Sequence, residues 1–184
     1  SVLEIDKMIK NKLNYPVFIK PARLGSSVGV CKVSCLNELI DALYMAKDLD
    51  DKILIEKNIE GRELECALLG SSASVVGEIL ASDVFYSYDA KYNNSDSKTL
   101  IPADIDDDTM KKIQSIALKA ARVVDITAIS RIDFFLENNT NKIYLNEINT
   151  LPGFTDISMY PKLIEYGGIS YSELLDRLIN LAKL

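Results

Sequence analysis

The sequence predicts an α+β fold of two subdomains, each with a mainly antiparallel sheet and flanking helices. Hydrophobic residues recur at helical spacing in the longer stretches and form short extended runs between them. Most of the short runs are neighbours joined by turn residues, which is typical of antiparallel hairpins. The 184 residues are 48% hydrophobic and 26% charged, as in an ordinary globular chain that can bury a core.

Residues 1–62 are expected to form the first subdomain. Its helices are predicted over residues 2–13 and 36–48, and its strands over residues 17–20, 28–33 and 52–57. Pro16 ends the first helix. The Gly- and Ser-rich residues 25–29 are interpreted as the loop of a hairpin.

Residues 63–184 are expected to form the second subdomain. Its strands are predicted over residues 63–70, 73–81, 128–137 and 143–149, and its helices over residues 106–124 and 170–184. Residues 85–104 are rich in Tyr, Asn, Ser and Asp, and residues 149–160 are also irregular. Loops of this length inside a compact domain usually have a function or are mobile.

Composition excludes several classes of protein. The formal net charge is −6, which disfavours binding to nucleic acid, and no apolar run approaches the ~20 residues of a membrane-spanning helix. The sequence has no histidine, so mechanisms that need an imidazole base are excluded within this chain. The cysteines, Cys31, Cys35 and Cys66, form no C-x-x-C pair and are expected to be buried thiols in a reducing cytoplasm, not zinc ligands.

The clearest chemical signal lies on the last two predicted strands. Side chains alternate between the faces of a strand, so Arg131 shares a face with Asp133, and Glu147 shares a face with Asn149. A short hairpin would bring the two pairs together. Oxygen ligands beside a cationic side chain suit Mg²⁺ or Mn²⁺ holding a phosphate. An ordinary ion pair on an exposed sheet face would produce the same spacing.

Four further patterns suggest parts of a phosphate or nucleotide site, although each also fits an ordinary turn, strand end or solvated loop. They are Lys20 before the small residues 25–29, Glu56 ending an apolar strand with Glu63 beyond it, Lys91 with Tyr92, and Gly153 after Pro152. Small residues let backbone amides approach a phosphate, and a lysine adds positive charge. A glycine N–H can stabilise an oxyanion, and a mobile segment can close over a reacting centre.

In their order along the chain, these stretches resemble the ATP-grasp superfamily and, within it, the D-alanine–D-alanine ligases. The matching segments are YPVFIKP (residues 15–21), LGSSVGV (24–30), LIEK (54–57), DAKY (89–92), RIDFF (131–135) and NEINTLPGFT (146–155). Together they extend over nearly the whole chain, so the resemblance is specific. It implies an ATP-grasp fold in which two subdomains hold ATP between them.

The resemblance also implies roles for individual residues. The residues implied to bind ATP are Lys20, Ser26, Ser27, Glu56, Lys57, Ile59, Glu63, Lys91 and Asn146. Asp133, Glu147 and Asn149 match the ligands of two Mg²⁺ or Mn²⁺ ions. Those implied in catalysis are Arg131 and the Gly153 amide at the tetrahedral intermediate, Ser26 at the first D-alanine, and Tyr92, which bears on substrate choice. Ser158 and Met159 match positions near the second amino acid.

The implied activity is the ATP-dependent formation of D-Ala–D-Ala for peptidoglycan through an acyl phosphate. The resemblance implies a bacterial, cytoplasmic enzyme, homodimeric in its whole form, without a nucleic-acid or membrane partner. Members of the family also have an N-terminal domain of roughly a hundred residues, a typical domain size. No counterpart of that domain is found in this sequence, so the 184 residues by themselves are expected to be inactive.

Three alternatives remain open at this stage. D-serine could replace the second D-alanine, whereas Tyr92 and the lack of histidine argue against the lactate-forming ligases of vancomycin resistance. A different ATP-grasp carboxylate–amine ligase would lack an amino-acid pocket at residues 149–160. A non-catalytic nucleotide-binding module would leave Asp133 and Glu147 facing solvent.

Overall fold

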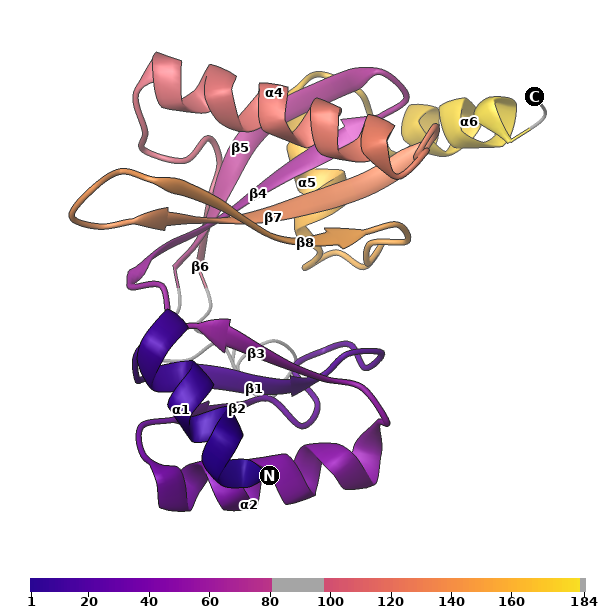
Figure 1. Ribbon diagram of the computed structural model, residues 1–184. Helices are drawn as coiled ribbons and strands as arrows, with labels where there is room; N and C mark the ends of the chain where they lie inside the picture. The colour runs from indigo at the N-terminus through magenta and orange to yellow at the C-terminus, as the bar shows by residue number, and fades with distance from the viewer. Residues whose placement is uncertain (81–97, 183–184) are drawn as a thin grey trace. The chain divides into compact units, whose positions relative to one another are not determined.

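The computed structural model describes residues 1–80 and 98–182 and confirms the α+β class. Its strands form a three-stranded and a five-stranded sheet, and every strand pairing is antiparallel (Figure 1). The chain divides into two compact units, whose described parts are residues 1–59 in the first and residues 60–80 with 98–182 in the second. None of the helices in these described parts is long and apolar enough to cross a membrane.

The first unit packs two helices against one face of its sheet. The strands are β1 (Val17–Pro21), β2 (Cys31–Val33) and β3 (Ile53–Lys57), in the order β2-β1-β3, and the helices are α1 (Val2–Lys12) and α2 (Leu36–Leu49). Val17 and Ile19 of β1 are fully buried and join one core with Ile9 of α1 and Leu39 of α2. Because side chains alternate along a strand, Lys20 belongs to the opposite face from this core.

The strand predicted over residues 28–33 is too long, because β2 begins only at Cys31. Ser26 and Ser27 have φ angles of 54° and 60°, and Gly29 has a φ of 73°, so the backbone turns here and is not extended. Gly29 also lies so close to neighbouring side chains that a Cβ atom would come within 2.5 Å of Leu49 Cδ1. The turn therefore packs against α2 where an extended strand would not.

The second unit has a five-stranded sheet with helices on both faces. The strands are β4 (Gly61–Leu69), β5 (Ser72–Leu80), β6 (Lys98–Leu100), β7 (Ile129–Glu137) and β8 (Ile143–Asn149), in the order β6-β5-β4-β7-β8. The helices are α4 (Asp107–Val123), α5 (Met159–Tyr166) and α6 (Tyr171–Leu181). Figure 1 shows α4 on one face of the sheet and α5 on the other.

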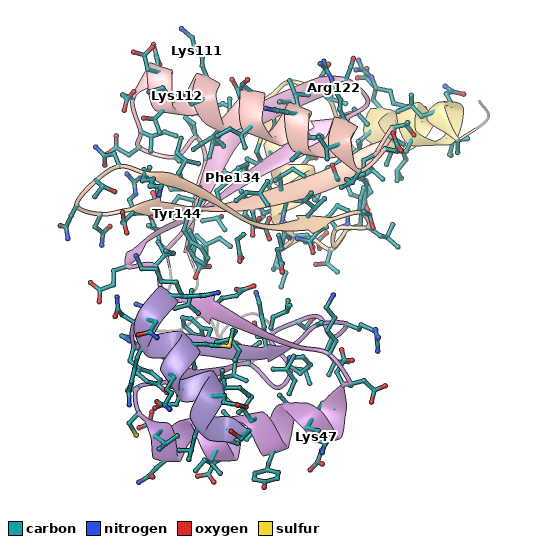
Figure 2. All side chains as sticks on the ribbon, in the orientation of Figure 1. Lys47, Lys111, Lys112, Arg122, Phe134 and Tyr144 are labelled. Carbon is teal, nitrogen blue, oxygen red and sulfur yellow. The ribbon has the colours of Figure 1, made fainter. Side chains whose placement is uncertain are left out.

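Alternate residues of β4 enter two different cores. Leu64 and Leu68 pack with Phe134 and the buried side of α4, and Phe134 is marked in Figure 2. Ala67 and Leu69 pack on the other face, with α5 and α6. Exposed charged side chains, among them Lys111, Lys112 and Arg122, mark the solvent side of α4 (Figure 2). The end of β4 is a nearly continuous apolar run because helices cover both faces of the sheet there and bury both sets of side chains.

Two short elements were not predicted. Strand β6 lies inside the segment 85–104 and pairs with the edge of β5, Leu100 opposite Glu78. Helix α5 has only 8 residues and carries Pro161 in its first turn, where proline is tolerated. Both elements depend on partners distant in the sequence, which is why periodicity did not reveal them.

The expectation that all three thiols are buried is wrong for two of them. Cys66 is fully buried in β4, but Cys31 is partly exposed and Cys35, at the start of α2, is exposed. Burial raises the pKa of the Cys66 thiol to about 12. None of the three forms a disulfide.

Candidate active site

The register between β7 and β8 brings the predicted acidic and basic residues together. Arg131 lies opposite Asn149, and Asp133 lies opposite Glu147. The Asn149 Nδ2 atom donates to Asp133 Oδ2 at 3.0 Å and to Glu147 Oε1 at 3.2 Å. The i, i+2 spacing on two strands therefore gives the single-face cluster that the sequence predicts.

A register shift in β8 lies directly beside this cluster. The pairing passes from Asp133 opposite Glu147 to Phe134 opposite Leu145, so it skips Asn146. An extra residue in one strand changes which way the side chains beyond it point. Without this shift Leu145 and Glu147, two residues apart, would share a face.

Arg131 is held by carboxylates from two neighbouring strands. Its Nε and Nη2 atoms donate to the two oxygens of Asp133, each at 2.7 Å. On the other side Glu65 of β4 places Oε2 3.1 Å from Nε. Burial by itself lowers the pKa of the Arg131 guanidinium, but the hydrogen bonds and charge of Asp133, with the charges of Glu65 and Glu147, outweigh it and the net shift is upward. Arg131 is therefore a permanent cation.

The burial of Arg131 and Asp133 argues against two of the explanations that the sequence left open. The side chains of Arg131 and Asp133 are only 18% and 12% exposed, so they are not an ordinary ion pair on a wet sheet face. Asp133 does not face solvent as a non-catalytic module would require, although Glu147 is exposed. Burial raises the pKa of Asp133, the guanidinium of Arg131 opposes that rise, and the charge of Glu147 adds to it.

The donor chemistry of this cluster fits a hard divalent cation. Asp133, Glu147 and Asn149 provide two carboxylates and one amide, and oxygen ligands are those that Mg²⁺ and Mn²⁺ prefer. Arg131 interacts with three carboxylates, Glu65, Asp133 and Glu147, so negative charge is in excess within these four side chains. In residues 1–80 and 98–182 no three His, Cys, Asp or Glu side chains converge as a metal site, so the set depends on the Asn149 amide.

The segment after β8 is fixed by aromatic contacts and by a hydroxyl network. Phe154 lies 5.4 Å from the Tyr160 ring and 6.0 Å from the Tyr171 ring, and its carbonyl accepts from the Tyr171 hydroxyl at 3.1 Å. Ser158, the residue before α5, accepts from the Thr155 N–H at 3.0 Å. Gly153 is exposed, and a Cβ there would come within 2.7 Å of Ser158 Oγ. Gly153 and Ser158 are thus neighbours.

Met159 lies in the core. It is only 4% exposed and packs with the residues of α5 and β4 on that face of the sheet. A Cβ on Gly77 would come within 2.9 Å of its sulfur. Any contact of this position with a bound molecule would therefore come from its backbone.

In the first unit, Lys20 and Glu56 are direct partners. The Lys20 Nζ atom lies 2.6 Å from Glu56 Oε2, although the two residues belong to separate patterns in the sequence. Lys57 follows at the exposed end of β3, and Ile59 is partly buried. Ser26 and Ser27 lie in the turn described above, where the Val28 N–H donates to the Gly25 carbonyl at 3.1 Å.

The base of this turn is anchored by a buried carboxylate. Asp50 accepts from the backbone N–H of Arg23 at 2.7 Å and from that of Lys52 at 3.0 Å. The Arg23 Nη1 atom lies 3.0 Å from Asp50 Oδ1, the oxygen that also accepts from the Lys52 N–H. The hydrogen bond from Lys52 is the largest cause that lowers the Asp50 pKa, burial opposes it, and the Arg23 backbone hydrogen bond and charge lower it further.

The remaining predicted residues lie in strands β4 and β8 or outside the described chain. Glu63 is in β4, opposite Ile79 of β5 and Phe135 of β7. Asn146 is the residue that the β7–β8 register skips. Lys91 and Tyr92 lie outside the described residues.

Glu65 is the residue of the cluster that the sequence analysis missed. It is 5% exposed and lies opposite Asp133 in the β4–β7 pairing. Its signal was an acidic residue directly before the apolar run of residues 66–69, where a charge is rarely buried without a partner. That signal becomes readable only once β4 is known to pair with β7.

A family model described as "D-ala D-ala ligase C-terminus" matches residues 2–180. The chain belongs to this family. The ligase relatives include the D-alanine–D-alanine ligase of Acetivibrio thermocellus, 52% identical over 181 residues, covering 97% of this chain and 48% of that protein. The chain thus spans about half the length of the curated relatives that it matches.

Solved ligase structures have the same fold. The D-alanine–D-alanine ligase of Coxiella burnetii superimposes with a TM-score of 0.85 at 36% identity, covering 99% of this chain and 48% of that one. The VanG D-Ala:D-Ser ligase of Enterococcus faecalis gives a TM-score of 0.85 at 39% identity, covering 97% of this chain and 53% of that one. The expected ATP-grasp fold is therefore confirmed.

Proposed function

We propose that this chain is the catalytic C-terminal part of an ATP-dependent D-alanine–D-alanine ligase. The observation that carries the proposal is the cluster of Arg131, Asp133, Glu147 and Asn149 on one face of the β7–β8 hairpin. It combines a permanent cation with oxygen donors for a divalent metal. The ligase relatives support the choice of substrate, because relatives at 46% to 52% identity are named D-alanine–D-alanine ligases.

In the proposed reaction, the carboxylate of one D-alanine attacks the γ-phosphorus of ATP, which gives an acyl phosphate and ADP. The amine of a second D-alanine attacks the acyl carbon, and inorganic phosphate leaves as the peptide bond forms. The intermediate carries negative charge on the former carbonyl oxygen. Fixed N–H donors stabilise such a charge most effectively in a site that excludes water.

Individual residues take the following proposed roles. Arg131 and the Gly153 N–H stabilise the oxyanion of the intermediate. Asp133, Glu147 and Asn149 would hold Mg²⁺ or Mn²⁺, which offsets negative charge on phosphates. The residues proposed at ATP are Lys20, Ser26, Ser27, Glu56, Lys57, Ile59, Glu63, Lys91 and Asn146. Ser26 would also place the first D-alanine, Ser158 and Met159 would lie near the second, and Tyr92 would affect its choice.

Lys20 must change partner in this proposal. Its ammonium group pairs with the Glu56 carboxylate at 2.6 Å. Both side chains are partly exposed, at 20% and 39%, so the pair can open at modest cost. A phosphate would then compete with the Glu56 carboxylate for the same cation.

The two units, predicted as subdomains 1–62 and 63–184, are proposed to be the remaining central part and the C-terminal part of the ligase. Its use of ATP for peptidoglycan places the proposed reaction in the bacterial cytoplasm. The proposal includes the homodimer implied by the resemblance, which size-exclusion chromatography with light scattering on the whole protein tests.

The decisive experiment is an amino-acid panel with the whole protein to which this sequence belongs. ATP-dependent phosphate release would be measured with D-alanine alone, and with D-alanine together with D-serine or D-lactate, and products identified by mass spectrometry. We expect D-Ala–D-Ala as the main product. D-Ala–D-Ser as the main product would instead support the D-serine alternative, which the 39% identity to the VanG ligase keeps open. No D-alanine-dependent phosphate release would contradict the proposal.

A further inference from the structure

We propose that Glu65 is a positioning residue that orients the Arg131 guanidinium for peptide bond formation. This inference rests on the proposed function, which gives Arg131 its role at the intermediate. Glu65 itself is assigned no contact with substrate. Its effect would pass through Arg131.

The contact joins two central strands of the second unit. Glu65 Oε2 lies 3.1 Å from Arg131 Nε, and the two side chains are 7% and 18% exposed. In the β4–β7 pairing Glu65 lies opposite Asp133, and Arg131 lies opposite Ala67. The guanidinium is thus bracketed by two carboxylates that both belong to a paired and buried part of the sheet.

The hydrogen bonds of Arg131 use one edge of its guanidinium and leave the Nη1 end for substrate. Its hydrogen bonds to described residues run from Nε and Nη2, both to Asp133. An arginine has five N–H donors in fixed planar geometry, so fixing this edge also fixes the direction of Nη1. A displacement of about 1 Å at a reacting centre is enough to lower turnover by about 100-fold.

Asp133 cannot be reserved for this task. It also accepts a hydrogen bond from Asn149 at 3.0 Å, and it belongs to the proposed metal-ligand set. Glu65 does not belong to that set. Its ion pair with Nε is therefore a second contact to the guanidinium, and it comes from the neighbouring strand β4.

Stability alone does not explain a glutamate at this position. Taking a carboxylate and a guanidinium out of water costs several kcal/mol per ion, and a buried pair often stabilises no better than apolar residues of similar size. The next residues of β4, Cys66, Ala67 and Leu68, are apolar and fully or almost fully buried. A role in orienting the Arg131 guanidinium would explain why a charged glutamate is buried at this position.

The same sheet contains a matched control. Glu78 of β5 is 6% exposed, and its carboxylate receives Nε and Nη2 of Arg62, each at 2.6 Å. Glu78 lies opposite Leu64, so this pair belongs to the face that packs on α4 and not to the face of Arg131. Removing either carboxylate breaks one buried arginine pair, but only Glu65→Gln touches the cluster.

The test uses the whole protein with five variants: Glu65→Gln, Glu65→Asp, Glu78→Gln, Arg131→Lys, and Glu65→Gln combined with Arg131→Lys. Phosphate release gives kcat and the KM values for ATP and D-alanine, and thermal unfolding gives the melting temperature. We expect Glu65→Gln to lower kcat by about 10–100-fold while the KM for ATP changes less than about threefold. Glu65→Asp, which keeps the charge, should recover part of the loss, and Glu78→Gln should leave kcat within about threefold.

The combined variant tests whether Glu65 acts through Arg131. If it does, Glu65→Gln should lower kcat by no more than about threefold when Arg131→Lys is already present. Unchanged kcat in Glu65→Gln, equal losses in Glu65→Gln and Glu78→Gln, or the full loss in the Arg131→Lys background would each overturn the inference while leaving the proposed function intact. An unsubstituted protein without D-alanine-dependent phosphate release would instead overturn the proposed function, and the inference with it.

Discussion

At the scale of single residues, the candidate site depends on the contrast between Asp133 and Glu147. Asp133 is buried and fixed by Arg131, whereas Glu147 is exposed and contacts Asn149. Substitution of Asp133 would therefore disturb the packing and the guanidinium together. Glu147 can be changed with little effect on folding, which makes it the better probe of metal binding.

We expect Glu147→Gln in the whole protein to raise the Mg²⁺ concentration for half-maximal phosphate release by at least about tenfold. Loss of a partner of a metal ligand already costs about 10–100-fold in affinity, and the loss of a ligand should cost no less. The melting temperature should stay nearly unchanged because the side chain is exposed. Glu165→Gln, an exposed acid in α5, is the charge-matched control. An unaltered Mg²⁺ dependence would remove Glu147 from the metal-ligand set.

Asp50 gives a prediction about pH. Its pKa is lowered from 3.8 in the folded protein, first by the Lys52 N–H, so its ionised form stabilises the fold. That contribution is fully present above the unfolded pKa and is lost as the pH falls through the lower folded value. The difference in melting temperature between the unsubstituted protein and Asp50→Asn should be largest near neutral pH and shrink below about pH 4.

The neighbouring Asp51 provides the control for this measurement. It is exposed, and Asp51→Asn removes the same charge from the same turn. Its effect on the melting temperature should be small at every pH. A difference for Asp50→Asn that grows toward acid pH would contradict the proposed anchoring of the turn.

At the scale of elements, the close pairing of β4 and β7 is what assembles the site. Gly61 begins β4 where the strands are in tight contact, and a Cβ there would come within 2.3 Å of the Leu136 carbonyl oxygen and 2.8 Å of its carbon. These are backbone atoms, which a side-chain movement cannot relieve. The strands can adopt this register because the residue is glycine.

Gly61→Ala should therefore destabilise the second unit by about 1–3 kcal/mol, the usual cost of forcing an extra methyl into a packed position. The urea midpoint of the whole protein, followed by near-UV circular dichroism, would measure the loss. Gly25→Ala is the natural comparison, because nothing lies within 4 Å of a Cβ there. Equal midpoints for the two variants would mean that β4 and β7 can move apart enough to accept the methyl group with no loss of stability.

Much of this element structure was predictable from the sequence. Helices α1, α2, α4 and α6 and the strands around them follow from local periodicity, and the joint face of Arg131, Asp133, Glu147 and Asn149 follows from alternation. Other features depend on distant partners: the pairing of β6 with β5, the packing of α5 on β4 and β5, and the place of Glu65 beside Arg131. The skipped residue Asn146 is of the same kind, because no local pattern marks it.

At the scale of the whole molecule, the described residues form three cores, but the chain spans only 48% of the length of the Acetivibrio relative. Purified residues 1–184 are expected to make no D-Ala–D-Ala, because correct positioning of both amino acids supplies about 7–11 kcal/mol of the barrier. The resemblance implies an N-terminal domain that these 184 residues do not match, and we assign part of this positioning to it. D-alanine-dependent phosphate release by residues 1–184 at a rate close to that of the whole protein would contradict this.

Because Cys66 is buried, its thiol can report how often the core of the second unit opens transiently to solvent. The thiol lies at 0% exposure in β4, its Sγ is 3.8 Å from the Ser74 carbonyl oxygen, and its pKa is raised to about 12. An alkylating reagent attacks thiolates, so at neutral pH it should modify exposed Cys35 quickly and reach Cys66 only when the core under α4 opens. The rate at which mass spectrometry detects alkylation of Cys66 would then measure that opening without any substitution.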